Sequence, residues 1–175
     1  MTRGLALVLV ALSLPARADI FLVRHAEKKN PKDDKSTLSK AGLKRAEDLK
    51  RAMSSVDLKA VYHTEYERTK QTAGPTAAAH MLTPIVTNSD DVKGLAKTLR
   101  GVSSNEDVLV VGHSDTIPDV LHELGVSTTV VIGPNDYDNL FLVSPRASGE
   151  PDFHVLHYGD APAPSAAPGP MKRKP

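Results

Sequence analysis

The chain has 175 residues, of which 40% are hydrophobic and 25% are charged, and it contains no cysteine. These values are typical of one globular domain with a sizeable core, and they exclude a fibrous protein. The absence of cysteine excludes disulfides, cysteine nucleophiles and cysteine-ligated zinc.

The formal net charge of +1 hides an acidic central region. All 21 acidic residues lie within residues 19–160, whereas five of the 22 basic residues lie outside it, which leaves 17 basic residues there and a net charge of −4. Those five are Arg3, Arg17, Lys172, Arg173 and Lys174. Because a nucleic-acid-binding domain is expected to be basic, we expect no nucleic-acid partner, and any bound anion must be held by a local group of cations.

The two ends of the chain differ in composition from the middle. Residues 1–18 combine a basic start, a short apolar stretch and the ending Ala16-Arg17-Ala18, which is typical of a signal peptide cleaved after Ala18. The apolar stretch is shorter than the roughly 20 residues that a membrane-spanning helix needs. Residues 161–175 are rich in proline and alanine and predict a disordered basic tail. We therefore expect a domain at 19–160 in an exported protein, periplasmic or secreted, without stable membrane insertion.

The first predicted element of that domain is a strand at residues 20–23. Four consecutive apolar residues, two of them β-branched, indicate a strand buried on both faces, which is typical of a mostly parallel sheet covered by helices. The strand ends at Arg24 and His25. In open α/β sheets the functional site lies outside the carboxyl ends of the strands, so these two residues are candidates for it.

A polar loop at 28–35 separates this strand from a predicted helix with Ser39 as its N-cap, in which Gly42 indicates a close approach of another backbone. A second strand at 58–62 leads into a helix with Arg68 in its first turn. A cation there opposes the helix dipole, so either an anion binds nearby or Arg68 pairs with Glu65 or Glu67. The Gly74-Pro75 pair predicts a kink or a restart of that helix.

The second half of the domain repeats the arrangement of the first strand. A strand at 84–87 and a short helix ending at Gly101 precede a second apolar run, residues 107–111, which ends at His113. A helix with Pro118 in its first position and Gly125 as its stop follows. Strands are predicted at 139–143 and 153–158, with some strand character at 130–132. Three strand ends thus bring Arg24, His25, Arg68 and His113 to one edge of the sheet.

These four side chains suit phosphoryl chemistry. The two guanidiniums offer planar forks of donors that match phosphate oxygens, and the two imidazoles supply a nucleophile or base and a further donor. Phosphoryl transfer needs little more, provided that a histidine attacks phosphorus and an acid protonates the leaving oxygen. No Walker loop and no Gly-x-Gly-x-x-Gly motif follows a strand, so we expect no nucleotide cofactor.

Three blocks of sequence carry a resemblance to a known family. They are Arg24-His25-Ala26-Glu27-Lys28, residues 64–73 around Arg68, and residues 110–118 around His113. In this order and at these strand ends, they resemble the motifs of the histidine phosphatase superfamily. The resemblance implies a three-layer α/β/α sandwich around a mostly parallel sheet, the phosphoglycerate-mutase-like fold. It also implies His25 as the nucleophile that forms a phosphohistidine, with Arg24, Arg68 and His113 binding the phosphoryl oxygens, and no metal or organic cofactor.

The general acid is the least certain part of this resemblance. Many relatives place a glutamate in an insertion, and the equivalent stretch here, residues 83–97, contains none. Asp115 lies two residues beyond His113 and is our first candidate, although it could instead only cap the following helix. Glu27, Asp90 and Asp91 are the other candidates, and the two aspartates could equally cap a helix.

The lack of a large insertion indicates a compact, open member that hydrolyses small phosphomonoesters or a phosphorylated protein side chain. A mutase is disfavoured, because it must shield its phosphoryl group from water. Two alternatives stay open. One is a metal site made of His25, Glu27, His113 and Asp115, against which the two arginines count. The other is a non-catalytic phosphate- or anion-binding envelope protein on the same fold.

Overall fold

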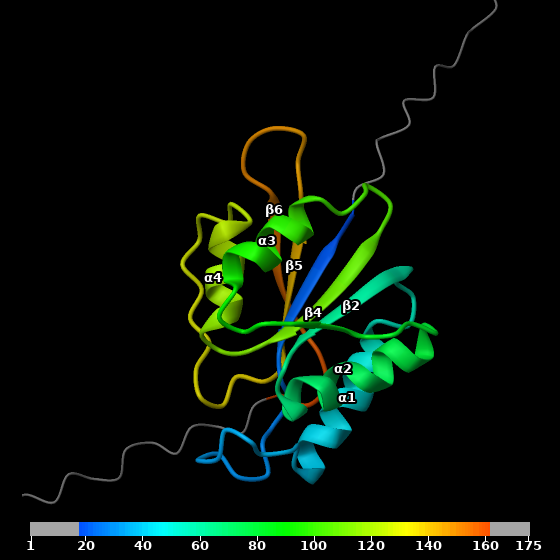
Figure 1. Cartoon of the computed structure of the whole chain (residues 1–175), viewed down its shortest axis with the longest axis vertical. Coiled ribbons are helices and arrows are strands. Elements are labelled where there is room, and N and C mark those ends of the chain that lie inside the picture. Colours follow the sequence, from blue (N-terminus) through cyan, green and yellow to red (C-terminus); the bar gives the residue numbers. More distant parts are fainter. Residues whose placement is uncertain (1–17, 162–175) are drawn as a thin grey trace, which may run out of the picture.

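The computed structural model describes residues 18–161, in which six strands form one sheet between two layers of helices (Figure 1). The sheet order is β3-β2-β4-β1-β5-β6. In chain order the elements are β1 (Ile20–Arg24), α1 (Lys40–Ala52), β2 (Leu58–Thr64), α2 (Glu67–Ala79), β3 (Ile85–Thr87), α3 (Val92–Arg100), β4 (Asp107–Gly112), α4 (Thr116–Glu123), β5 (Asn139–Ser144) and β6 (Asp152–His157). Strands β1 to β4 pair in parallel, whereas β5 is antiparallel to both of its neighbours, β1 and β6. The predicted α/β fold with a mostly parallel sheet is confirmed.

Each face of the sheet packs against a different pair of helices. Helices α1 and α2 cover one face, and α3 and α4 cover the other, as Figure 1 shows. Successive side chains of a strand point to opposite faces, so Phe21 and Val23 of β1 join the core with α1 and α2, while Ile20 and Leu22 join the core with α3 and α4. Strand β1 is therefore buried on both sides, as its apolar sequence predicted.

The topology brings three strand ends together. Strand β4 lies between β1 and β2, and all three run in the same direction, so their carboxyl ends share one edge. Arg24 pairs with Gly112 in the register of β1 and β4, and the next backbone N–H, that of His25, donates to the Gly112 carbonyl at 2.9 Å. The residues that follow β1 and β4 are therefore fixed beside each other by the main chain.

Helix α1 lies close against the loop that follows β1. A Cβ atom at Gly42 would lie 2.3 Å from the Glu27 carbonyl oxygen, so only glycine fits there. The Ser39 backbone N–H donates to the same carbonyl at 2.8 Å, and the Ser39 side chain caps the helix as predicted. These contacts hold the loop at residues 25–28 against the start of α1.

Two local predictions were wrong, and a third is only partly tested. Helix α2 continues through Pro75 to Ala79, as expected, and it does so without a restart, because Ala73 and Ala77 pack on the sheet and hold the turns on either side. Helix α4 begins at Thr116 and not at Pro118, because the Asp115 side chain caps it. Residues 130–132 form no strand; they lie in a loop that passes over the edge of the sheet where β1 ends.

The predicted signal peptide and tail lie outside the described residues, apart from Ala18 and Ala161 at their boundaries. Across residues 18–161, no helix is both long enough and apolar enough to cross a bilayer.

Candidate active site

His25 is the first residue after β1, and its side chain is only 4% exposed. Its Nδ1 lies 2.8 Å from the Ala26 carbonyl oxygen, which can only accept. The neutral ring therefore carries its proton on Nδ1, and the lone pair is on Nε2. Burial lowers the pKa of His25 to about 3, and the nearby His113, Arg68 and Arg24 act in the same direction. At neutral pH this side chain is therefore uncharged, with a lone pair on Nε2.

Arg24 ends β1 and is held without any carboxylate partner. Its Nη1 donates to the carbonyls of Gly133 at 2.8 Å and Pro134 at 3.1 Å, and its guanidinium lies 4.1 Å from the centre of the Tyr137 ring. The Nε atom is buried without a partner within residues 18–161, and burial lowers the pKa of Arg24. An arginine keeps its charge even so, which leaves a cation ready for an anionic ligand.

Arg68, in the first turn of α2, is held in the same way. It is 7% exposed and lies 4.2 Å from the centre of the Tyr66 ring. It donates to the Asp34 carbonyl and, through Nη2, to His113 Nδ1 at 3.3 Å, while its Nε has no partner in the described part of the chain. The alternative pairing with Glu65 or Glu67 does not form.

Both of those glutamates are engaged elsewhere. Glu65 accepts from the backbone N–H and hydroxyl of Ser89, and Glu67 accepts from the side-chain amide of Gln71. Among residues 18–161, no carboxylate pairs with Arg68 at the start of this helix.

His113 follows β4 and completes the group. Its ring centre lies 5.3 Å from that of His25 and 5.1 Å from that of Tyr66, and its Nε2 is 2.8 Å from Thr64 Oγ1. Burial, followed by the charge of Arg68, lowers the pKa of His113 to about 4. The structure therefore brings together two cations and two neutral imidazoles, as the sequence predicted.

These four residues line one cavity of about 480 Å³. Its wall also includes Tyr66 and Tyr137, and charged residues that line it come from three loops: Lys28, Asp34, Asp90 and Asp115. A cavity of this size and polarity accommodates a phosphoryl group with a modest leaving group.

Sequence reasoning missed several of these lining residues. Asp34 and Lys28 had the signal of a polar loop directly after the His25 strand, although nothing there distinguished one residue from another. Tyr66 and Tyr137 had no pattern at all, because a tyrosine in a loop or before a helix is common in any fold. Their role depends on which arginine they stack against.

The four candidates for the general acid differ in position. Asp115 is exposed and lines the cavity, and it also caps α4 by accepting from the Thr116 backbone N–H at 2.8 Å. Asp90 is exposed and also lines the cavity. Asp91 caps α3 through a bond from the Gly94 N–H at 2.9 Å and does not line the cavity.

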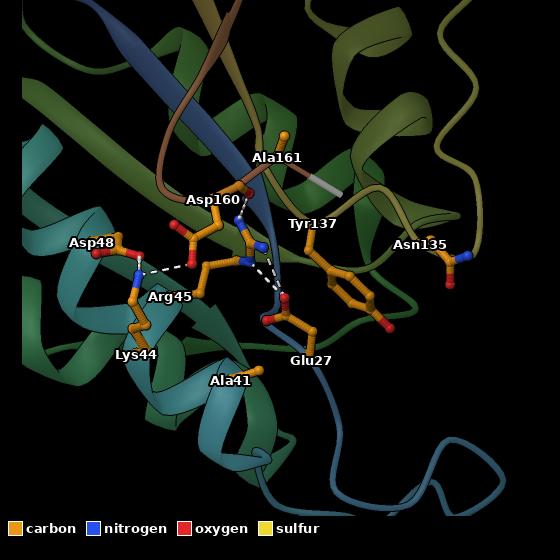
Figure 2. Close-up of a pocket in the computed structure, with 9 residues that line it drawn as sticks. All are labelled: Glu27, Ala41, Lys44, Arg45, Asp48, Asn135, Tyr137, Asp160 and Ala161. Carbon is orange, nitrogen blue, oxygen red and sulfur yellow. Dashed lines mark hydrogen bonds and ion pairs between the residues drawn. The ribbon is translucent and has the colours of Figure 1, made fainter. Parts of the chain in front are cut away.

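Glu27 faces a different cavity, shown in Figure 2. Its Oε1 lies 2.8 Å from both Nε and Nη2 of Arg45. The two side chains point toward each other, and both line a cavity of about 300 Å³. Tyr137 lines both cavities. Glu27 is therefore not placed to protonate a group bound beside His25. Within residues 18–161, no three histidine, aspartate or glutamate side chains gather closely enough to hold a metal ion.

Comparison with known proteins agrees with this site. The sequence profile described as "Histidine phosphatase superfamily (branch 1)" matches residues 20–90, which include His25, Arg24 and Arg68. Over these residues the chain is similar to members of this superfamily. No curated protein matches the sequence significantly.

Solved structures share the fold over most of the described residues. The alpha-ribazole phosphatase from Shigella flexneri superposes with a TM-score of 0.66 at 13% identity, covering 79% of this chain and 96% of that one. The protein histidine phosphatase SixA, in complex with tungstate, gives 0.63 at 18% identity, covering 79% and 96%. A mycobacterial glucosyl-3-phosphoglycerate phosphatase gives 0.63 at 11% identity, covering 81% and 98%. At these identities the similarity shows the fold, and the phosphoglycerate-mutase-like architecture is confirmed.

Proposed function

We propose that the protein is a phosphatase that hydrolyses a phosphomonoester, or a phosphorylated protein side chain, through a phosphohistidine on His25. The observation that carries the proposal is the combination of a neutral His25, whose Nε2 carries no proton, with the half-buried Arg24 and the buried Arg68, neither of which pairs with a carboxylate within residues 18–161. A phosphoryl dianion supplies the missing negative charge.

The reaction follows from these positions. Nε2 of His25 attacks phosphorus, the bond from phosphorus to the leaving oxygen breaks, and the carboxyl group of Asp115 gives a proton to that oxygen. Water then attacks the phosphohistidine, Asp115 takes the proton from that water, and phosphate leaves. Arg24 and Arg68 stabilise the charge on the phosphoryl oxygens in both steps.

The substrate is a small phosphoester or a phosphorylated side chain. The open cavity, about 480 Å³ in volume, supports either. The structural neighbours include a protein histidine phosphatase and a glucosyl-3-phosphoglycerate phosphatase, so the fold accepts both classes.

The first test is turnover of a generic aryl phosphate by the purified chain with EDTA present throughout. We expect the wild type to be active, His25→Ala to be inactive and His154→Ala, an exposed control on β6, to match the wild type. Vanadate binding without turnover would support the anion-binding alternative. Near-full activity of His25→Ala would remove the phosphohistidine mechanism.

Asp115 is tested by comparing two leaving groups. Asp115→Asn is expected to reduce turnover of an alkyl phosphate by about 10²–10⁴-fold, and that of a nitrophenyl phosphate far less, because the latter needs no proton. Asp91→Asn, outside the cavity, is the control. If Asp90→Asn or Asp34→Asn shows this dependence on the leaving group and Asp115→Asn does not, the aspartate whose variant shows it is the general acid.

We also propose export followed by cleavage after Ala18. The backbone nitrogen of Asp19 lies 2.8 Å from Asp107 Oδ1, so a new amino terminus at Asp19 would be an ammonium group beside a carboxylate. Mass spectrometry of protein recovered from an exporting host is expected to show Asp19 as the first residue. An intact Met1 would contradict this proposal.

A further inference from the structure

A chain of hydrogen bonds runs from the catalytic cavity into the core through His113. Nε2 of His113 lies 2.8 Å from Thr64 Oγ1, which lies 3.0 Å from Thr69 Oγ1. Thr69 Oγ1 in turn lies 2.9 Å from the Thr64 carbonyl and 2.7 Å from the Tyr66 carbonyl. Thr64 is 4% exposed and Thr69 is fully buried. The chain is thus sheltered from water, and each hydroxyl depends on these partners.

The direction of each hydrogen bond from His113 to Thr69 follows from which atoms can donate and which can only accept. Both carbonyls only accept, so the single proton of the Thr69 hydroxyl points to them. Thr69 Oγ1 must then accept from the Thr64 hydroxyl, whose own proton is used in that bond. Thr64 Oγ1 is left to accept, and His113 must donate to it from Nε2.

The other side of the ring leads to the same assignment independently. Nη2 of Arg68 lies 3.3 Å from His113 Nδ1, and a guanidinium only donates, so Nδ1 accepts. A neutral imidazole has one proton, which both arguments place on Nε2. The two catalytic histidines therefore hold opposite tautomers, with the proton on Nδ1 in His25 and on Nε2 in His113.

We propose that Thr64 and Thr69 are positioning residues that lock His113 in the Nε2–H tautomer, so that its Nδ1 faces Arg68 and the phosphoryl site. The lock has a chemical consequence. In the free protein Nδ1 accepts from Arg68 and helps to hold that guanidinium in the cavity. To bind a phosphoryl oxygen directly, His113 must gain a second proton at Nδ1, while its bond to Thr64 is kept.

The tautomer is read directly by long-range ¹H–¹⁵N correlation spectra of the full chain labelled with ¹⁵N-histidine at neutral pH, with the His113 signals assigned by comparison with His113→Gln. We expect a protonated Nε2 and an unprotonated Nδ1 in the wild type. Thr64→Val, which has the same shape but no acceptor, is expected to weaken the preference for the Nε2–H tautomer, because only the bond from Arg68 then favours it, and Thr64→Ser is expected to keep it. A wild-type His113 with its proton on Nδ1, or a Thr64→Val spectrum identical to the wild type, would overturn the proposal.

The kinetic part of the test rests on the proposed phosphatase function, whereas the spectra do not. Thr64→Val is expected to lower kcat/KM by about tenfold, as for a lost hydrogen bond to a charged group, and Thr64→Ser is expected to restore most of it. If Thr64→Val does not fold, the wild-type spectrum still decides the tautomer. Absence of turnover in the wild type would refute the phosphatase function and leave the spectral result standing.

Discussion

Three buried or half-buried arginines near the loop after β1 are held in two different ways. Arg45, on α1, bonds to the Glu27 carboxylate at 2.8 Å and to the carbonyls of Tyr158 and Asp160. Arg24 and Arg68 donate to main-chain carbonyls and lie on tyrosine faces, and no carboxylate of the described residues is within bonding distance of either. The first arrangement is a structural ion pair, whereas the other two are cations that lack an anion.

The pKa values report the same difference. Burial lowers the pKa of Arg45, but the hydrogen bond and charge of Glu27 outweigh it and the net pKa is raised. Burial also dominates at Arg24, and there the pKa is lowered. Burying a charge without a paired carboxylate is costly, and this cost is the reason we propose a ligand at this edge of the sheet. The proposed anion site is the cavity of Arg24 and Arg68, and not the cavity of Arg45.

The largest expected effect is on activity, when an uncompensated arginine is removed. Arg24→Gln and Arg68→Gln are each expected to lower kcat/KM by about 10²–10³-fold, because each supplies donors to the charge that develops in the transition state. Neither should reduce the free energy of unfolding, since a buried charge without a carboxylate is removed. Kinetics and urea unfolding of the same samples test the loss of activity and the retained stability. A variant with a lower free energy of unfolding and unchanged activity would show that this arginine is structural, as Arg45 is.

The next effect is on stability, when the compensated arginine is removed. Arg45→Gln leaves Glu27 without its partner, and we expect a loss of about 3 kcal/mol in the free energy of unfolding, at the low end for a broken buried pair because the Glu27 side chain is 23% exposed. The double variant Arg45→Gln/Glu27→Gln should recover part of this loss. Urea unfolding of the two single variants and the double variant measures the coupling, and additive losses would contradict a direct ion pair.

Near neutral pH, the smallest expected effect is the dependence of stability on pH. The pKa of His25 is lowered from 6.5 to about 3, and that of His113 from 6.5 to about 4. Between these lowered values and pH 6.5, the unfolded chain therefore binds more protons than the folded one. The free energy of unfolding is therefore expected to fall as the pH drops below 6.5. His25→Gln/His113→Gln should flatten this dependence, and His154→Gln should not. An unchanged slope in the double variant would show that other groups cause it.

The sequence was sufficient to predict the buried strands and the residues that follow them, because both are marked by runs of apolar residues. The buried strands 20–23 and 107–111 were identifiable because both faces are apolar, and their parallel pairing brought His25 and His113 together. The start of α1 at Ser39 and the need for Gly42 were also predictable, because a cap and a close contact leave local signals.

Features that depend on contacts between distant loops were not predictable. Nothing in the spacing of Glu27 showed that it turns toward Arg45, 18 residues away, and not toward His25. The same holds for Tyr137, which stacks on Arg24 from a loop where strand character was expected at 130–132. The hydroxyl chain of Thr64 and Thr69 lay within a block that the sequence did identify, but its direction follows only from the distances.

The most direct test of the central claim is to locate the phosphoryl group during turnover. The protein is mixed with an aryl phosphate, quenched without acid so that a phosphohistidine survives, digested and examined by mass spectrometry. We predict one phosphoryl group on the peptide that contains His25, on that residue, and none in His25→Ala. Turnover with the phosphoryl group on another residue, or on none under conditions that preserve phosphohistidine, would contradict the account.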